Sequence, residues 1–353
     1  MTTATQEMRI DPEEMRDAAR RLLADKLDRR AAWEGKSDAN KGLDAEIGEL
    51  GWYQLNAQEE LGGLGQTFEA LGPVYEELGK SLAPLWLSGT LATIDALQSS
   101  GGDAAQLVKD IIEQGWRVAP VILPRGMSMA DARLPMVPGA AEASHLLIVE
   151  ESGSALIVEA SAPGISVSPV QTWDLGRSYG EVVLSGPEGG QASVDAGRAL
   201  PVLRAHLELA IAWDSIGGGL QCLTETVEYM LGRQQFGRPI ASFQALKHRA
   251  ADHKVNIELA RSLAVRATSL FADKADGWAT VATQARILAG EAYAAMAEDC
   301  VQLFGGVGFT WEYNAHLFLK RALVNQLVGG SPDELRDRVA EEVCRRALDS
   351  RPA

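Results

Sequence analysis

The stretch Arg233-Gln-Gln-Phe-Gly-Arg-Pro-Ile240 lies between two long helical patterns. Apolar residues recur at helical spacing before it, starting at Leu203, and again after it, from Leu246 to Ala264. Further along the chain, Gln302-Leu-Phe-Gly-Gly-Val-Gly-Phe309 ends a third, alanine-rich helical pattern. The sequence therefore predicts a C-terminal bundle of long helices in which two connections carry distinctive Phe-Gly and Gly-Gly turns.

The composition is that of a soluble globular protein. Hydrophobic residues make up 46% of the 353 residues and charged residues 23%, and this length suggests two or three domains. The net charge of −15 argues against nucleic acid and anionic membranes as partners. In so acidic a chain, an Arg at a turn, such as Arg233, stands out as a contact for an anionic ligand.

Cysteine usage and the N-terminus predict a cytoplasmic protein. The three cysteines, Cys222, Cys300 and Cys344, are far apart and form neither a metal-binding pattern nor a disulfide framework. We expect all three to be small core residues, and we predict no metal site. Residues 1–10 are polar and expected to be disordered, and no apolar run approaches the length of a transmembrane helix.

The residue pattern changes twice along the chain, which predicts three domains and an α+β fold class. Helical spacing over residues 11–117 predicts an N-terminal helical domain, in which Gly51 ends one helix. Residues 118–192 predict a small middle domain, an antiparallel sheet or barrel. Residues 193–353 predict the helical bundle, whose last helix opens with the capping box Ser331-Pro-Asp-Glu334. The expected strands are Val118–Leu123, His145–Val149, Ala155–Glu159, Ile165–Pro169 and Glu181–Leu184.

Three short motifs near the N-terminus occur in the order found in the acyl-CoA dehydrogenase family. They are Leu50-Gly-Trp52, Glu60-Leu-Gly-Gly-Leu-Gly65 and Glu76-Glu-Leu-Gly79. Together with the turns at Arg233 and Gln302, they make nearly the whole chain resemble this family, although the middle domain resembles it weakly. The resemblance implies the family's fold, with an N-terminal helical domain, a small β-barrel or sheet domain and a C-terminal helical bundle. It also implies FAD as the cofactor and an acyl-CoA as the substrate.

The resemblance implies that each FAD site is built from two subunits, and this chain keeps the residues that a neighbouring subunit supplies. Arg233 matches the Arg that binds the FAD diphosphate, and Phe236 matches the Phe that packs on the cofactor. Ile240 and Phe243 match positions on the adenine side. The second contact loop matches Gln302, Leu303, Gly305 and Gly306.

The residues that a subunit supplies to its own FAD are changed in this chain. Gly329 stands where the family usually carries its catalytic Glu, and Asp333 stands where it usually carries a Gln. A carboxylate such as Asp333 would repel the FAD diphosphate. The segment from Leu123 to His145 is shorter than in the family and lacks the family's flavin-contacting groups.

A second position for the base exists in some family members, on the long helix before the Arg turn. Counting back from Phe236 places this position at Leu207, with Glu208 next to it. One residue on a helix is a rotation of about 100°, so Glu208 is a candidate base only if the register is shifted by one residue. Its other interpretation is a solvated or ion-paired helix residue.

The sequence thus predicts a subunit of an FAD-dependent acyl-CoA dehydrogenase that introduces an α,β double bond into an acyl-CoA but lacks the usual base. The stretches Gly308-Phe-Thr-Trp-Glu312 and His316-Leu-Phe-Leu-Lys-Arg321 resemble actinobacterial members that act on bulky thioesters such as steroid side-chain CoA. Several of these form α2β2 tetramers, so the expected partner is a longer homologue. The alternatives are a self-sufficient homo-oligomeric dehydrogenase, a flavin monooxygenase or oxidase on the same fold, and a structural subunit without flavin.

Overall fold

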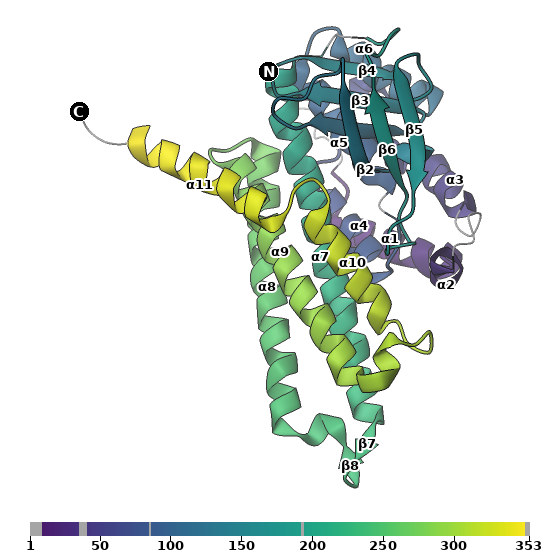
Figure 1. Cartoon of the computed structure of the whole chain (residues 1–353), viewed down its shortest axis with the longest axis vertical. Helices are drawn as coiled ribbons and strands as arrows, with labels where there is room; N and C mark the ends of the chain where they lie inside the picture. The colour runs from purple at the N-terminus through teal and green to yellow at the C-terminus, as the bar shows by residue number, and fades with distance from the viewer. Residues whose placement is uncertain (1–8, 35–40, 85, 192–193, 350–353) are drawn as a thin grey trace, which may run out of the picture. The chain divides into compact units, whose positions relative to one another are not determined.

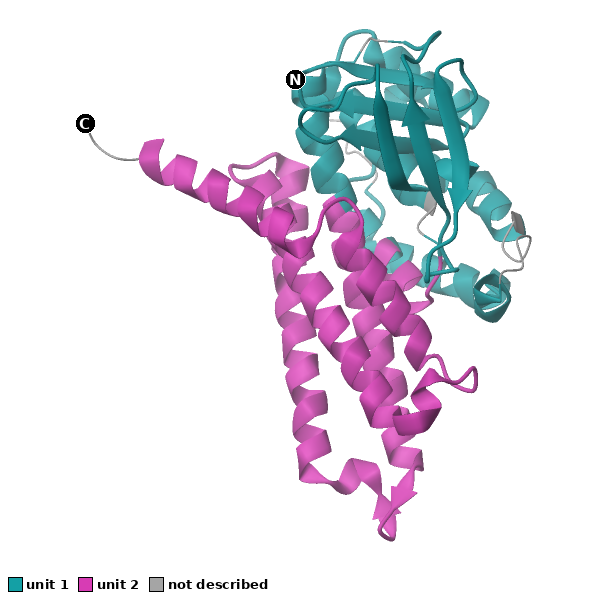
Figure 2. Ribbon diagram, viewed as in Figure 1, with its two compact units in different colours: residues 1–74, 84–207 teal, residues 75–83, 208–353 magenta. Residues whose placement is uncertain are grey.

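The computed structural model describes residues 9–34, 41–84, 86–191 and 194–349, which belong to two compact units (Figure 2). The first unit comprises residues 1–74 and 84–207, and the second comprises residues 75–83 and 208–353. The three domain bounds given by the sequence stay a prediction. The expected disorder of residues 1–10 falls mostly outside the described residues.

Two helices of the first unit show the local signals that set their ends. α1 (Pro12–Lys26) begins after Asp11, whose carboxylate accepts a hydrogen bond of 2.8 Å from the amide of Glu13. α3 (Lys41–Glu49) is followed by Gly51 at φ 73°, which confirms the predicted glycine stop. The other helical elements of the N-terminal region are α2 (Arg29–Trp33), η1 (Trp52–Gln54), η2 (Glu59–Leu61), α4 (Phe68–Lys80), α5 (Trp86–Ser100) and α6 (Ala104–Gln114).

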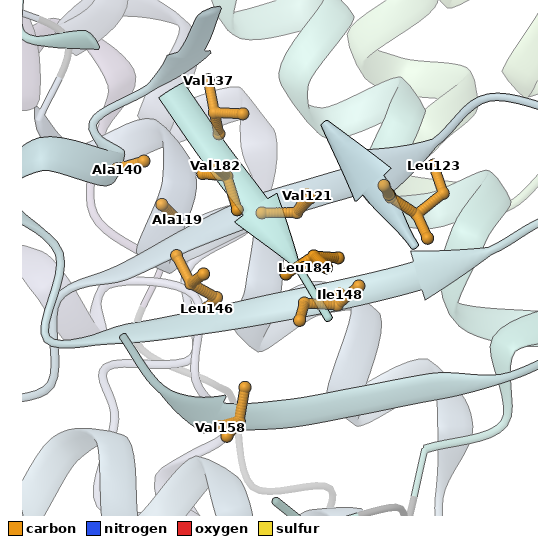
Figure 3. Close-up of a cluster of buried hydrophobic side chains, with 11 residues drawn as sticks. Ala119, Val121, Leu123, Val137, Ala140, Leu146, Ile148, Val158, Val182 and Leu184 are labelled. Atoms are coloured by element: carbon orange, nitrogen blue, oxygen red, sulfur yellow. The ribbon is translucent and has the colours of Figure 1, made fainter. Parts of the chain in front are cut away.

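Six strands within residues 86–191 form two three-stranded sheets. In one sheet, β3 pairs in parallel with β1 and antiparallel with β4; in the other, β6 lies between β2 and β5. Apolar side chains of both sheets form one buried cluster that includes Val121, Ile148 and Val182 (Figure 3). The strands are β1 (Val118–Leu123), β2 (Ala132–Pro138), β3 (His145–Glu150), β4 (Ala155–Glu159), β5 (Ile165–Val170) and β6 (Tyr179–Leu184), and η3 (Ala140–Glu142) follows β2.

The structure confirms the five predicted strands and corrects two points about the sheets. β2 is an additional strand that the sequence pattern does not indicate, because it contains Pro135 and ends at Pro138. The ladder between β2 and β6 shifts register between Leu134 and Val137, and a bulge of this kind accommodates a proline. The expected all-antiparallel arrangement is also wrong, since β1 and β3 run parallel.

The second unit is a bundle of long helices that run alternately up and down (Figure 1). At one end of the bundle, a short hairpin of β7 (Gln234–Gln235) and β8 (Arg238–Pro239) connects α7 to α8, and η5 (Gly305–Phe309) connects α9 to α10. At the other end, the turn after Leu327 leads into α11. The helices are α7 (Ala196–Gly232), α8 (Gln244–Asp273), α9 (Trp278–Phe304), α10 (Ala315–Leu327) and α11 (Pro332–Asp349), and η4 (Ile240–Ser242) precedes α8.

The structure confirms the predicted capping box of the bundle and the burial of two of the three cysteines. The amide of Ser331 donates to Glu334 Oε2 at 2.7 Å, and the amide of Glu334 donates to Ser331 Oγ at 3.4 Å, so the capping box forms. Cys222 and Cys300 are buried as expected, but Cys344 is exposed. It lies on α11, whose only buried residue is Leu335. No helix in the described part of the chain is long and apolar enough to cross a membrane.

A close approach of two backbones explains the glycine of the motif Glu76-Glu-Leu-Gly79. A Cβ atom at Gly79 would lie 2.0 Å from the carbonyl oxygen of Asp214 on α7. From the side of α7, a Cβ atom at Gly217 would lie 2.0 Å from the carbonyl oxygen of Glu76 on α4. These separations exclude any side chain, so glycine is required on both helices where they cross.

Glu76 of the same motif is a buried carboxylate held by two cations. Its oxygens accept hydrogen bonds of 2.9 and 2.8 Å from the guanidinium of Arg261, and Lys80 Nζ lies 2.8 Å away. Burial alone would raise the pKa of Glu76, but hydrogen bonding and charge from Arg261, followed by Lys80, lower this pKa to about 2. The ion pair therefore fixes the second half of α4 against α8.

Replacing Glu76 by Gln should lower the free energy of unfolding by about 2 to 3 kcal/mol at neutral pH, because Arg261 loses its carboxylate partner. The folded pKa of Glu76 lies below its ordinary value of 4.5, so its contribution is complete above pH 4.5 and disappears as the pH falls towards 2. Urea unfolding across this pH range measures the difference. Glu69→Gln, on the exposed side of α4, is the control, and equal effects of both substitutions would contradict the assignment.

Candidate functional site

The Arg233 stretch folds as a tight hairpin at one end of the bundle (Figure 1). The amide of Arg233 donates to the carbonyl of Tyr229 at 2.9 Å, and its own carbonyl accepts from the amide of Ile240 at 2.8 Å. The two turn residues, Phe236 and Gly237, both have positive φ values, 54° and 76°. This is the backbone of a two-residue turn that matches the twist of a hairpin.

Phe236 occupies this turn at a cost in stability. A left-handed backbone conformation is unfavourable for a bulky side chain, and the ring of Phe236 gains little burial, since the residue is 92% exposed. It stands edge-on to Phe243 with ring centroids 6.2 Å apart, and the guanidinium of Arg238 lies 4.1 Å from the centroid of the Phe243 ring. A strained, exposed aromatic residue is typical of a binding surface.

The second predicted contact loop opens its backbone to solvent. Gln302 is exposed near the end of α9, whereas the side chain of Leu303 is buried. Gly305 ends α9 with φ 66° and ψ −145°, a conformation that only glycine adopts readily. A Cβ atom built at Gly305 or Gly306 would meet no atom within 4 Å, so a ligand could approach both backbone groups closely.

Tyr229 holds the two loops together. Its hydroxyl donates to the carbonyl of Phe304 at 3.2 Å, and the two rings stack with centroids 4.1 Å apart. Tyr313 packs edge-on against both rings, at 5.4 Å from Tyr229 and 5.1 Å from Phe304. Because Tyr229 lies one helical turn before Arg233, this cluster brings the Arg233 hairpin and the Gly305 turn to the same end of the bundle.

The two candidate base positions lie at the other end of the bundle. Glu208 is 4% exposed, accepts a hydrogen bond of 2.6 Å from Thr283 Oγ1, and forms an ion pair with Arg338. Gly329 is exposed in the turn between α10 and α11, where its φ is 74°. The helix from Glu208 to its end at Gly232 rises by about 1.5 Å per residue, or about 36 Å in all. The structure therefore separates the residues predicted to contact flavin from the candidate base positions.

Charged side chains surround the Gly329 turn. Arg286 of α9 is buried beneath it and donates to main-chain carbonyls of the turn. Burial lowers the pKa of Arg286 to about 10; the charge of Glu208 opposes this shift and that of Arg338 adds to it. The guanidinium is therefore still cationic at neutral pH. Asp333 is exposed and accepts a hydrogen bond of 2.8 Å from Arg336, which compensates part of its charge.

Tyr229 and Arg286 are two residues of these sites that were not predicted from the sequence. Tyr229 could have been noticed as an aromatic residue four positions before Arg233, on the same face of the helix. Arg286 stands alone in the alanine-rich stretch of α9, and a single Arg among apolar residues is a signal for a buried polar contact. Its partners are backbone groups, which carry no signature in the sequence.

Comparison with known proteins agrees with this architecture and defines the class of the protein. Residues 11–106 match the model of the acyl-CoA dehydrogenase N-terminal domain, and residues 205–344 match that of the C-terminal domain. The chain is 33% identical over 311 residues to the acyl-CoA dehydrogenase IpdE2 of Mycobacterium tuberculosis, a match that covers 86% of this chain and 89% of that protein. The chain belongs to the acyl-CoA dehydrogenase family.

Two solved structures share the fold. One chain of the ChsE4–ChsE5 complex of Mycobacterium tuberculosis superimposes with a TM-score of 0.84 at 22% identity, and the match covers 100% of this chain and 100% of that chain. A variant of the Tcur3481–Tcur3483 steroid ACAD superimposes with a TM-score of 0.82 at 23% identity, over 96% of this chain and 98% of that chain. Members of the family bind FAD.

Replacing Phe236 by Asn should raise the free energy of unfolding of the isolated chain by about 0.5 to 1 kcal/mol, because Asn tolerates the left-handed conformation that strains Phe. Thermal unfolding measures the change. Phe309 is also an exposed Phe, but its φ is not positive, so Phe309→Asn serves as the control and should not stabilise. If the Phe236→Asn variant is less stable than the native chain, the claim that Phe236 is strained is wrong.

Proposed function

We propose that this chain is one subunit of an FAD-dependent acyl-CoA dehydrogenase, and that it supplies the diphosphate side of a flavin site completed by a partner subunit. The observation that carries this proposal is the distance along α7, about 36 Å between Glu208 and the end of the helix before Arg233. One chain therefore cannot bring both ends of its bundle to one flavin.

The residues at the hairpin end fit a dinucleotide. Arg233 is exposed, and its side chain makes no hydrogen bond or ion pair with the described residues. Its guanidinium could bind the diphosphate through charge-assisted, bidentate hydrogen bonds. Phe236 would pack its exposed ring on the cofactor, and Ile240 and Phe243 would line its adenine side. The open backbone at Gly305 and Gly306 would let the cofactor approach closely, next to the exposed amide of Gln302.

The other end of this chain supplies no base in this proposal. FAD held at this site would supply the acceptor for the hydride that leaves the β-carbon of the acyl thioester. Removal of the α-proton requires a carboxylate held beside the substrate. Gly329 has no side chain, and we assign Glu208 to the buried ion pair with Arg338 and the hydrogen bond from Thr283. The base then comes from the partner, which leads us to infer an α2β2 assembly with a longer homologue.

The inferred substrate is a bulky acyl-CoA, with steroid-derived thioesters as the first candidates. Support comes from the relatives: one structure of the same fold is described as a steroid ACAD, and another is a complex of two different chains.

Replacing Arg233 by Ala in the assembled complex should weaken FAD retention by about 1.5 to 3 kcal/mol, the contribution of a hydrogen bond to a charged group. Flavin absorbance after dialysis, relative to protein, measures the loss. Arg266→Ala removes the same charge from an exposed position on α8 and serves as the control. Unchanged flavin content in a folded Arg233→Ala complex would remove Arg233 from the site.

A further inference from the structure

The side chain of Arg286 on α9 holds the turn between α10 and α11 through hydrogen bonds to its main chain. The side chain extends from α9 and is 4% exposed. Its Nη2 atom donates to the carbonyls of Asn325 and Gly330 at 3.4 Å each, and more closely to the carbonyl of Val328. Carbonyls at the end of a helix lack partners within the helix, so Arg286 completes the C-terminus of α10.

The other terminal nitrogen of Arg286 is left for a ligand. Nη1 makes no hydrogen bond with the described residues. It lies under Gly329: a Cβ atom built on this glycine would meet Nη1 at 3.3 Å and no other atom within 4 Å, its chain neighbours aside. Since Gly329 is exposed, the missing side chain leaves a direct approach from solvent to the guanidinium.

The acidic residues nearby are already engaged. Glu208 acts on Arg286 through its charge, but its two oxygens are occupied by Arg338 and Thr283. Glu291 lines a small cavity beside Arg286 and forms an ion pair with Arg336. No carboxylate of the described residues lies within ion-pair distance of Arg286. A buried cation that contacts only neutral carbonyls is costly, and an anion placed beside it offsets that cost.

We propose that the turn Val328–Gly330 is a binding site for a carboxylate group, which enters over Gly329 and accepts a hydrogen bond from Arg286 Nη1. A carboxylate suits this position because it can meet the guanidinium with a charge-assisted hydrogen bond. The free end of an acyl chain and a free organic acid both present this group. The site needs no flavin and no partner subunit, so it stands independently of the function proposed for Arg233.

The test is a titration of the full chain with 13C-labelled propionate, followed by the broadening of the propionate NMR signal. The native chain should bind propionate saturably. Gly329→Glu places a carboxylate of the protein itself over Arg286 and should weaken propionate binding at least about tenfold, whereas Gly329→Ala has the same backbone strain without the charge and should bind more tightly than Gly329→Glu. The absence of saturable binding, or equal binding by the native chain and Gly329→Glu, would overturn the proposal.

A second test compares the stability of Gly329 variants and needs no added ligand. Gly329→Glu should be more stable than Gly329→Gln at neutral pH, and this difference should vanish in an Arg286→Gln background. Equal stability of the two variants with Arg286 present would overturn the proposal. Competition against propionate then identifies the source: displacement by glutaryl-CoA but not by butyryl-CoA assigns the site to an acyl chain ending in a carboxylate. If neither thioester displaces propionate, the site still stands, and its ligand is a free organic acid.

Discussion

The rigid length of α7 is the constraint on which the functional geometry depends. This helix has 37 residues, and glycine contacts hold it against α4 while polar contacts hold it against α10. Asn325 of α10 donates to Asp214 Oδ2 of α7 at 2.7 Å. The buried guanidinium of Arg321, also on α10, donates to the carbonyls of Leu82 and Ala83, just after α4, at 3.0 and 2.9 Å. Buried polar groups satisfied in this way give the helices one arrangement, which keeps the two ends of the bundle apart.

The two ends of the bundle differ in how their charged and aromatic groups are used. At the hairpin end, Phe236 is strained and exposed, and Arg233 makes no ion pair with the described residues. At the other end, Glu208 is engaged in an ion pair, and Arg286 supports a turn through Nη2, which leaves only Nη1 for the carboxylate proposed above. Groups left without partners at the expense of stability are typical of binding sites, whereas paired groups in a core mainly support the fold. This contrast is why we place the cofactor contacts at the hairpin end alone.

Periodicity and capping signals predicted most of the fold because they depend on neighbouring residues. Gly51 and the Ser331–Glu334 box set helix ends, and both could be predicted from the sequence. β2 could not, since its prolines disfavour a strand unless a bulge accommodates them, and the parallel pairing of β1 with β3 depends on distant segments. The candidate site residues likewise differ in whether a local motif predicts them. The turns at Arg233 and Gly305 carry motifs, but the role of Arg286 rests on backbone groups that any residue supplies.

The most direct test of the two-subunit account is the ratio of flavin to protein in the native assembly. The complex should be purified with its partner, denatured, and its released FAD counted against each chain. We expect one FAD for every pair of unlike chains, because only the site that combines this chain's hairpin end with the partner's base is complete. One FAD for every chain, or full flavin occupancy of this chain without any partner, would contradict it.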